Sequence, residues 1–270
     1  MNKLQRHYSF GKNWLGYSQI IGSSEIDSVT SDLIILLNMK NLKQVSVLDI
    51  GSGSGVHDVG FYRLGCRNLT AIDYDQDCVK ATQLTLEKFC PGSGFRVFQG
   101  DILSKDMQSL GKFDLVYSWG VLHHTGNLYG AIRNAASLVA EGGGQFAIAL
   151  YRKTLLCGFW KAEKRVYSIL PTIIQRFIEV IYISFFSLCL LFFRKTSIFN
   201  YIKNYSSKRG MNFFADVRDW LGGYPYESIS PDDLRILMSS LGFTQVYSLE
   251  GHNKIGVFGS GCDEFLFRKN

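Results

Sequence analysis

The chain has 270 residues, of which 46% are hydrophobic and 19% are charged. This balance is typical of a folded globular protein and excludes an intrinsically disordered chain. The net charge is +6, but residues 151–210 contain 11 Lys or Arg and only two acidic residues. Since the basic excess belongs to one segment, the protein as a whole does not present the basic surface of a nucleic-acid-binding protein.

Six cysteines are scattered along the chain without the CxxC spacing of a zinc site. We therefore expect reduced thiols inside the fold, and neither a disulfide framework nor a bound metal. The first ten residues, MNKLQRHYSF, lack the apolar stretch of a signal peptide. Together these features predict a cytoplasmic protein.

Residues 1–44 are predicted to form a helical segment ahead of the main domain. Aromatic side chains are frequent between His7 and Tyr17. We expect this stretch to fold over a bound ligand as a lid, with Trp14 and Tyr17 facing that ligand. The alternative is a surface helix that packs on the domain without touching a ligand.

Residues 45–150 alternate between short apolar stretches and longer amphipathic ones. The apolar stretches are rich in β-branched and aromatic residues, as strands are. Nearly continuous apolar strands that alternate with helices predict an α/β fold, a doubly wound parallel sheet covered on both faces. The predicted strands are 45–50, 69–73, 95–99, 113–118 and 144–150, and the predicted helices include 75–89 and 128–139.

Residues 151–227 are basic and aromatic, and Pro171 interrupts their helical pattern. We expect a largely helical insertion after the fifth strand. Its most hydrophobic part is 173–193, but the uncharged portion Val180–Phe193 has only 14 residues. A membrane-spanning helix needs roughly 20 such residues, so we predict that this segment does not cross a membrane.

Two alternatives remain for the apolar segment: a helix buried in the core, or a helix that lies on a membrane surface. Basic residues flank it with almost no acids, which favours peripheral contact of residues 161–208 with anionic lipid on the inner face of the membrane. The flanking bases are Lys161, Lys164, Arg165, Arg194, Lys195, Lys203 and Lys208.

The final segment, 228–270, is predicted to complete the sheet with a helix and a hairpin. Ser230 followed by Pro231 is a typical helix start, an N-cap and a proline in the first turn. The predicted elements are a helix over 232–240 and strands over 243–249 and 264–268, joined by the glycine-rich stretch 251–261.

The sharpest motif is the run VLDIGSGSG over 47–55. A strand ends here in a tight glycine turn, and a helix begins near Ser54. Glycines in such a turn adopt positive φ and let a ligand lie against bare backbone. On its own the pattern is weak, because several nucleotide-binding folds share it.

Polar or aromatic residues follow the next three strands. Asp73 ends the second strand, 22 residues after Gly51, where a carboxylate can accept both ribose hydroxyls of an adenosine. Asp101 follows the third strand, where it can meet the adenine edge, and Trp119 and Gly120 close the fourth. Each aspartate alone has an ordinary explanation as a helix cap or a loop turn. Because the carboxyl ends of parallel strands share one rim, the set predicts a nucleoside-binding crevice.

A nicotinamide-dependent oxidoreductase is the main rival interpretation. Its GxGxxG fingerprint requires a third glycine where this chain has Val56. No phosphate-binding signature is evident near the glycine turn, so the rival is disfavoured.

The runs VLDIGSGSG, IDYD, QGDI and FDLVYSWGVLHHTGN together resemble class I S-adenosylmethionine-dependent methyltransferases. The chain is similar in particular to the enzymes of ubiquinone and menaquinone biosynthesis. The resemblance is strong over 45–150 and extends to 10–18 and 209–227. It implies a seven-stranded Rossmann-like sheet whose last strand is antiparallel, with S-adenosyl-L-methionine as cofactor and S-adenosyl-L-homocysteine as product.

The resemblance also assigns residues to the cofactor. Glycines of the turn would border its methionine part, Asp73 would bind the ribose, and Asp101 would contact the adenine. The full set implied is Asp49, Gly51, Ser52, Gly53, Gly55, Asp73, Tyr74, Asp101, Ile102, Trp119 and Gly120, with Trp14 and Tyr17 added from the lid.

Methyl transfer requires a nucleophile held in line and, for a hydroxyl, a base that removes its proton. His123 follows the fourth strand on the reactive rim and is the candidate base. The alternative is that His123 and His124 only support the loop that shapes the pocket. Tyr151, which ends the fifth strand, is a second candidate for contact with the reacting molecule. The two histidines lack acidic or Cys neighbours at ligand spacing, so no metal is expected.

The acceptor side is predicted from the tract 209–226, which places charged and aromatic residues around Gly222 and Gly223. The candidate acceptor contacts are His124, Arg209, Trp220 and Tyr224, with structural packing of Trp220 as the alternative. We expect a small-molecule acceptor, with O-methylation of an aromatic or lipid-like hydroxyl. N- or S-methylation of a small metabolite, or a non-catalytic protein that binds the cofactor, are the alternatives.

Overall fold

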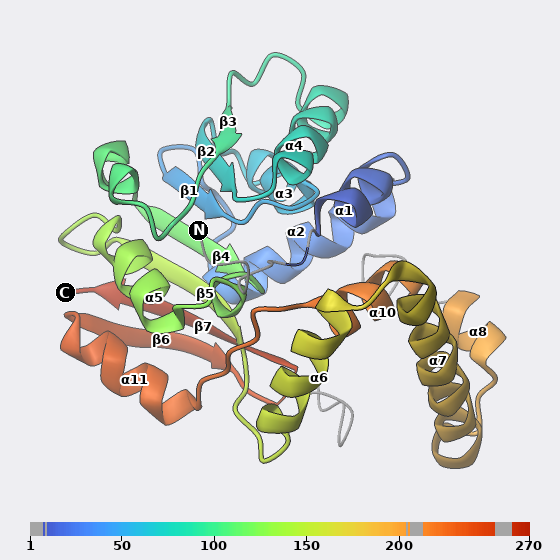
Figure 1. The fold of residues 1–270 in the computed structure, drawn as a ribbon. Coiled ribbons are helices and arrows are strands. Elements are labelled where there is room, and N and C mark those ends of the chain that lie inside the picture. The colour runs from blue at the N-terminus through green and yellow to red at the C-terminus, as the bar shows by residue number, and fades with distance from the viewer. Residues whose placement is uncertain (1–7, 9, 204, 206–212, 252–260) are drawn as a thin grey trace.

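The structure, a computed structural model, describes residue 8 and residues 10–203, 205, 213–251 and 261–270. Its centre is a seven-stranded sheet with the order β3-β2-β1-β4-β5-β7-β6 (Figure 1). Strand β7 runs antiparallel to both β5 and β6, whereas β1 to β5 are parallel. The predicted fold class is therefore confirmed. The strands are β1 (Ser46–Ile50), β2 (Asn68–Asp73), β3 (Arg96–Gln99), β4 (Leu115–Trp119), β5 (Gln145–Tyr151), β6 (Phe243–Leu249) and β7 (Cys262–Lys269).

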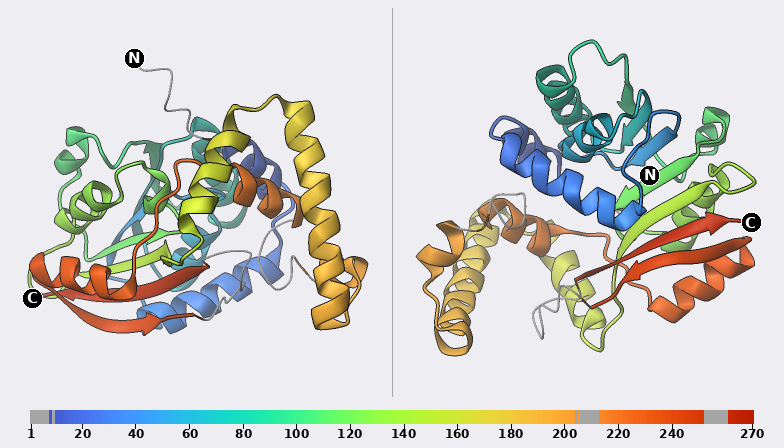
Figure 2. Two further views of the ribbon diagram at one scale, coloured as in Figure 1. Left: turned by 60° about the horizontal axis from the view of Figure 1, so that its bottom comes forward. Right: turned by 180° about the vertical axis from the view of Figure 1, so that it is seen from behind.

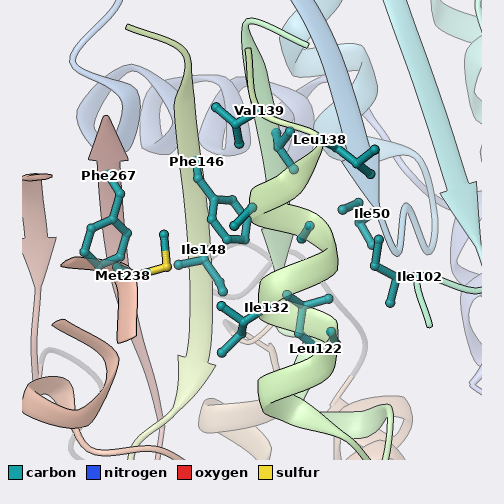
Figure 3. Close-up of a cluster of buried hydrophobic side chains, with 14 of the residues drawn as sticks. Ile50, Ile102, Leu122, Ile132, Leu138, Val139, Phe146, Ile148, Met238 and Phe267 are labelled. Carbon is teal, nitrogen blue, oxygen red and sulfur yellow. The ribbon is translucent and has the colours of Figure 1, made fainter. Parts of the chain in front are cut away.

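Helices cover both faces of this sheet, because successive residues of the central strands point to opposite sides. Leu48 and Ile50 face a cluster that includes α5 (Leu128–Ser137) and α11 (Pro231–Ser240) (Figure 3). Val47 faces the other cluster, with α2 (Ser23–Leu37) and α3 (Val56–Arg63). The remaining elements of this part are α1 (Gly11–Ser18), α4 (Gln76–Phe89) and the short 3-10 helices η1 (Lys105–Leu110) and η2 (Leu122–His124).

The insertion after β5 is helical, as predicted, and has a small core of its own. Its helices are α6 (Cys157–Ile169), α7 (Thr172–Arg194), α8 (Ile198–Lys203) and α10 (Phe213–Gly222). Tyr167, Phe213 and Leu221 are buried in a cluster that is separate from the two sheet cores. Helix α7 stands away from the sheet in each view of Figures 1 and 2.

The C-terminal elements follow the sequence prediction closely. The Ser230 hydroxyl accepts the backbone N–H of Asp233 at 3.1 Å, which confirms the predicted cap of α11. The predicted connection between β6 and β7 lies mostly outside the described residues, which resume at Gly261. All six cysteines are described, and each is a free thiol.

Ile132 offers a test of this architecture, because it is fully buried between α5 and the sheet (Figure 3). We expect Ile132→Ala to lower the free energy of unfolding by about 2–5 kcal/mol, since the lost methyl groups leave a cavity. Urea denaturation followed by circular dichroism measures the change. The matched control is Ile35→Ala on the exposed side of α2, which should change stability by less than about 1 kcal/mol. Equal losses for both variants would contradict the packing described here.

Candidate active site

The glycine turn after β1 adopts a conformation that side chains do not tolerate. Gly51, Gly53 and Gly55 have φ of 83°, 57° and 77°. A Cβ on Gly51 would overlap the side chain of Val121, which follows β4. The turn is held to β2 because the backbone N–H groups of Gly51 and Ser52 both donate to the carbonyl of Ile72, at 2.7 and 3.2 Å. A flat backbone surface therefore sits at a fixed place on the carboxyl rim of the sheet.

Asp73, at the end of β2, is held in place by backbone groups on two sides. Its Oδ2 accepts the Gly53 N–H at 3.0 Å, and its Oδ1 accepts the Asp75 N–H at 2.9 Å. The Cys78 thiol hydrogen-bonds the same carboxylate. A carboxylate can accept about four hydrogen bonds, so the side chain is oriented beside the glycine turn and keeps acceptor capacity for a ligand.

Two buried carboxyl groups lie next to each other below the turn. Asp49 on β1 and Asp58 on α3 are both almost fully buried. Burial raises the pKa of Asp49 to about 7. Burial, and then the charge of Asp49, raise the pKa of Asp58 well above its usual value. The Asp58 carboxyl, kept protonated by its raised pKa, can donate a hydrogen bond to Asp49, and this contact opposes the rise in the pKa of Asp49.

The residues predicted for the adenine and for the far end of the crevice lie on the same rim. Asp101 Oδ1 accepts the Leu103 N–H at 2.8 Å, and the adjacent Ile102 is buried. Tyr74 is 57% exposed, with its carbonyl accepting the side chain of Gln99 at 2.9 Å. Gly120 has a φ of 77° and open space beside it.

The neighbourhood of Trp119 contains a histidine that sequence reasoning missed. Trp119 Nε1 donates to Glu264 Oε1 on β7 at 3.2 Å. The ring of His57, on α3, lies 6.0 Å from the Trp119 ring and 5.3 Å from that of Tyr117. Burial lowers the pKa of His57 to about 4, so this imidazole is neutral at physiological pH. No motif marked His57, since it directly follows the glycine turn inside an ordinary helix.

Helix α1 covers the glycine turn. The Gly11 N–H donates to Asp75 Oδ2 at 3.0 Å, and the Trp14 ring lies 3.6 Å from the position of a Cβ on Gly53. Trp14 therefore lies beside the glycine turn, and its contact with a ligand stays a prediction. Tyr17 is buried in a cluster with Ile21 and Val59, because it is on the side of α1 that packs on the domain.

Aromatic rings gather around Tyr151, at the end of β5. The Tyr151 ring lies 3.8 Å from that of His123, 5.4 Å from that of His124, 5.8 Å from that of Trp220 and 5.3 Å from that of Tyr226. The ring of Trp160, on α6, lies 5.3 Å from that of Trp220. We call the six residues Tyr151, Trp160, Trp220, Tyr226, His123 and His124 the aromatic cluster.

His123 is fully buried in the aromatic cluster. Burial, and then the neighbouring His124, lower the pKa of His123 well below its usual value. Its Nδ1 accepts the Tyr151 N–H at 3.3 Å, which places the proton of the neutral ring on Nε2. Nε2 has no partner among the described residues. In this arrangement His123 is oriented as a hydrogen-bond donor, and its role as a base stays a prediction.

The other predicted acceptor contacts are only partly brought to the cluster. His124 Nδ1 lies 2.7 Å from the Pro225 carbonyl, which fixes its ring beside Tyr151. Trp220 Nε1 has no partner in the part of the chain that is described. Tyr224 is engaged through its main chain, where its carbonyl accepts the Tyr8 N–H at 2.9 Å. Arg209 lies outside the described residues.

Lys164 lies inside the aromatic cluster and not on the surface, contrary to its predicted place among the membrane-facing bases. Its side chain is fully buried, with Nζ 3.7 Å from the Trp220 ring centroid and donating to the Trp220 carbonyl. Burial lowers the pKa of Lys164 to about 8, and burial raises that of the adjacent Glu163 to about 7. The sequence showed its charge but not that α6 turns it inward.

Asp219 of α10 is a further buried carboxyl group between the two halves of the site. Its Oδ1 accepts Asn13 Nδ2 from α1 at 2.7 Å, whereas Oδ2 has no partner among the described residues. Burial, with a smaller contribution from Asp216, raises the pKa of Asp219 to about 8. The sequence analysis placed Asp219 among the charged residues of the acceptor-side tract but gave it no individual role, because only the contact with α1 distinguishes it from Asp216.

Comparison with known proteins bears on this site. Residues 47–143 match the family described as "Methyltransferase domain". A 47-residue segment is 45% identical to ribosomal protein L11 methyltransferase of Geotalea uraniireducens (strain Rf4). That segment is 17% of this chain and 15% of the relative, so the chain matches only a small part of that relative's length.

Residues 47–143 form a methyltransferase domain.

Solved structures extend the likeness of this methyltransferase domain to the whole fold. Magnesium protoporphyrin IX methyltransferase of Synechocystis PCC 6803, with bound S-adenosylhomocysteine, has a TM-score of 0.53 at 16% identity, over 91% of this chain and 82% of that one. The 1,6-didemethyltoxoflavin-N1-methyltransferase of Burkholderia thailandensis has a TM-score of 0.51 at 16% identity, over 91% and 78%. At this identity the likeness establishes the class I methyltransferase fold. Among the described residues, no group of three or more His, Cys, Asp or Glu could hold a metal ion.

The unusual ionisation of Asp219 predicts how stability depends on pH. A carboxyl with a raised pKa stabilises the folded state below its unfolded pKa, near 4, and this contribution is lost as pH rises towards about 8. We expect wild type to lose unfolding free energy relative to Asp219→Asn between pH 5 and 8, by more than about 1.4 kcal/mol, the equivalent of one pKa unit. Urea denaturation at a series of pH values measures this difference. A constant difference would show that Asp219 ionises normally.

Proposed function

We propose that the chain is an S-adenosylmethionine-dependent methyltransferase whose acceptor is a small molecule with an aromatic or lipid-like hydroxyl. The observation that carries the proposal is the alignment of the glycine turn, Asp73 and Asp49 on one rim of a methyltransferase domain. The bound S-adenosylhomocysteine of the Synechocystis structure supports the choice of cofactor. S-adenosylmethionine supplies a methyl group that is already activated on a sulfonium.

The donor-side residues fit such a cofactor. Asp73 would accept the ribose hydroxyls, because backbone N–H groups orient both of its oxygens beside the glycine turn. Asp49 would lie near the cationic methionine part, since it ends β1 directly before the glycine turn. Ionised Asp49 would then be stabilised by the ligand's positive charge. Trp14 would exclude water from the glycine turn.

The acceptor would lie against the aromatic cluster, where flat rings can contact a flat or apolar molecule. We assign Asp219 the proton-accepting role. A base with a pKa near the working pH combines a useful ionised fraction with adequate basicity, and the pKa of Asp219 is about 8. Its Oδ2 would take the hydroxyl proton as the new oxygen–carbon bond forms. The Nε2–H of His123 would donate a hydrogen bond that orients the acceptor.

An amine acceptor is the second candidate, and Lys164 supports it. An ammonium group already lies against the rings of Trp220, Tyr226 and Trp160, at 3.7, 5.4 and 5.6 Å from their centroids. A cation of similar size on an acceptor is attracted by the same ring faces. The finer resemblance to ubiquinone and menaquinone biosynthesis enzymes favours the hydroxyl, with a quinol-like acceptor. Competition between phenols and amines as acceptors separates the two candidates.

Asp73 tests the donor side. We expect Asp73→Ala to weaken the binding of S-adenosylhomocysteine about 10–150-fold, because the ribose hydroxyls lose their acceptor in a half-buried crevice. Isothermal titration calorimetry measures the affinity, and circular dichroism confirms folding. Glu87→Ala at an exposed position of α4 is the control and should bind like wild type. Unchanged affinity in Asp73→Ala, or binding of a nicotinamide cofactor by wild type, would contradict the proposal.

Asp219 tests the acceptor side. We expect Asp219→Asn to lower kcat at least about 100-fold while the affinity for S-adenosylhomocysteine changes little, because the amide cannot take a proton. The wild-type rate should rise with pH through about 8. Turnover is measured as the release of S-adenosylhomocysteine when phenols and quinols are offered as acceptors. The control is Asp232→Asn, at an exposed position of α11.

A loss of the same size in His123→Asn, together with an unchanged pH profile in Asp219→Asn, would transfer the base role to His123. Donor binding by wild type without turnover on any phenol, quinol or amine would favour a non-catalytic protein of this fold.

A further inference from the structure

Helix α7 presents an apolar face to solvent over most of its length. The exposed residues recur at intervals of three and four, the spacing of one face of an α-helix. Their exposed fractions range from 43% to 84%. At 1.5 Å per residue the face is about 28 Å long. It consists of Ile173, Ile174, Phe177, Val180, Ile181, Phe185, Leu188, Leu191 and Phe192, and we call it the α7 face.

The opposite side of α7 is the side that packs within the protein. Ile178, Tyr182 and Phe186 contact the small core of the insertion, and Leu190 is buried. Glu179 is also buried there and accepts hydrogen bonds from Tyr167 at 2.9 Å and Arg176 at 2.8 Å. Helix α7 is therefore apolar on two sides. One side packs on the insertion, and the other is exposed to solvent. A buried core helix, the first of the two sequence alternatives, does not describe α7.

The surface around the α7 face is positively charged. Within 151–203 the two acidic residues are largely withdrawn from solvent, with the Glu179 side chain 12% exposed and the Glu163 side chain 20% exposed. Exposed bases are retained on α7 and on the neighbouring helices. Arg176 and Arg194 belong to α7, Lys195 follows it directly, Lys161 and Arg165 belong to α6, and Lys203 ends α8. An apolar face bordered by bases is complementary to a surface with an apolar interior and an anionic outer layer.

We propose that the α7 face binds the surface of an anionic lipid bilayer, with the helix lying in the plane of the membrane. The 23 residues of α7 are long and apolar enough, by length and composition, to cross a bilayer. Crossing would remove the Arg176–Glu179 pair and the packed side of α7 from the protein core that satisfies them, which an in-plane orientation avoids. Pairing of two copies through the same face would bring two sets of bases together, whereas anionic lipid neutralises them.

This orientation has a consequence for the acceptor that rests on the proposed function. Trp160 and Trp220 of the aromatic cluster belong to α6 and α10, and these helices pack directly on each other and α10 on α7. The acceptor-side wall and the membrane-facing helix are thus parts of one packed unit. A lipid-like acceptor would then reach the aromatic cluster from the bilayer surface.

Vesicle sedimentation with the full chain tests the proposal. We expect binding to phosphatidylcholine vesicles that contain phosphatidylglycerol at low salt, and much weaker binding to phosphatidylcholine alone or at high salt. The variant Phe177→Gln, Ile181→Gln, Leu188→Gln should bind at least about tenfold more weakly, because it removes apolar insertion. Its control carries Ile35→Gln, Leu84→Gln and Ile236→Gln at exposed positions of α2, α4 and α11, and should bind like wild type.

Charge is tested separately. Reversal of Arg194 and Lys195 to Glu should also weaken vesicle binding at least about tenfold, whereas reversal of the exposed Lys40 and Lys43 to Glu should have a much smaller effect. Equal binding to neutral and anionic vesicles, or none to either, would overturn the proposal. So would a wild-type dimer in analytical ultracentrifugation that the glutamine variant of the α7 face dissociates. Each variant should bind S-adenosylhomocysteine as wild type does, so a failure of the proposed function appears in that titration and not in sedimentation.

Discussion

The carboxylate of Asp75 is the contact on which the organisation of the site depends. Its Oδ1 accepts the Asp77 N–H and begins α4, while its Oδ2 accepts the Gly11 N–H and fixes the start of α1. The Asp75 N–H in turn donates to Asp73. Only glycine fits at position 11, since a Cβ there would overlap the carboxylate. One residue therefore fixes Asp73, the start of α4 and the start of α1 in a single arrangement.

The sheet and the donor crevice could be predicted because their signals are local. A tight turn with positive φ requires glycine whatever surrounds it, and strands that are apolar throughout indicate a sheet covered on both faces. Asp73 was found for the same reason, by its position at a strand end. The predictions failed where the orientation of a side chain matters, since Tyr17 faces the core and Lys164 faces the aromatic cluster. They gave no individual role to His57, Asp58 and Asp219, whose surroundings come from segments distant in sequence. Periodicity shows that a helix has sides but not which neighbour each side meets.

Buried ionisable groups are concentrated in the two halves of the site, and their cost explains why they are informative. A charge removed from water is unfavourable unless it is paired, so Asp49 with Asp58, Glu163 with Lys164, and Asp219 all retain shifted pKa values. Apolar residues of similar size would make a more stable protein at these positions. Their retention is consistent with a site whose charge balance is completed by what binds to it.

The hydrogen bond between Asn13 and Asp219 joins α1 to α10, so the first turn of α1 is held both by Asp75, at the start of α4, and by α10. Two ligands that both depend on the position of one helix are thermodynamically linked. Whatever factor a bound donor adds to the affinity for the acceptor, the acceptor must add to the affinity for the donor. The same reciprocity holds for the two products: whatever factor one product adds to the affinity for the other, it receives in return.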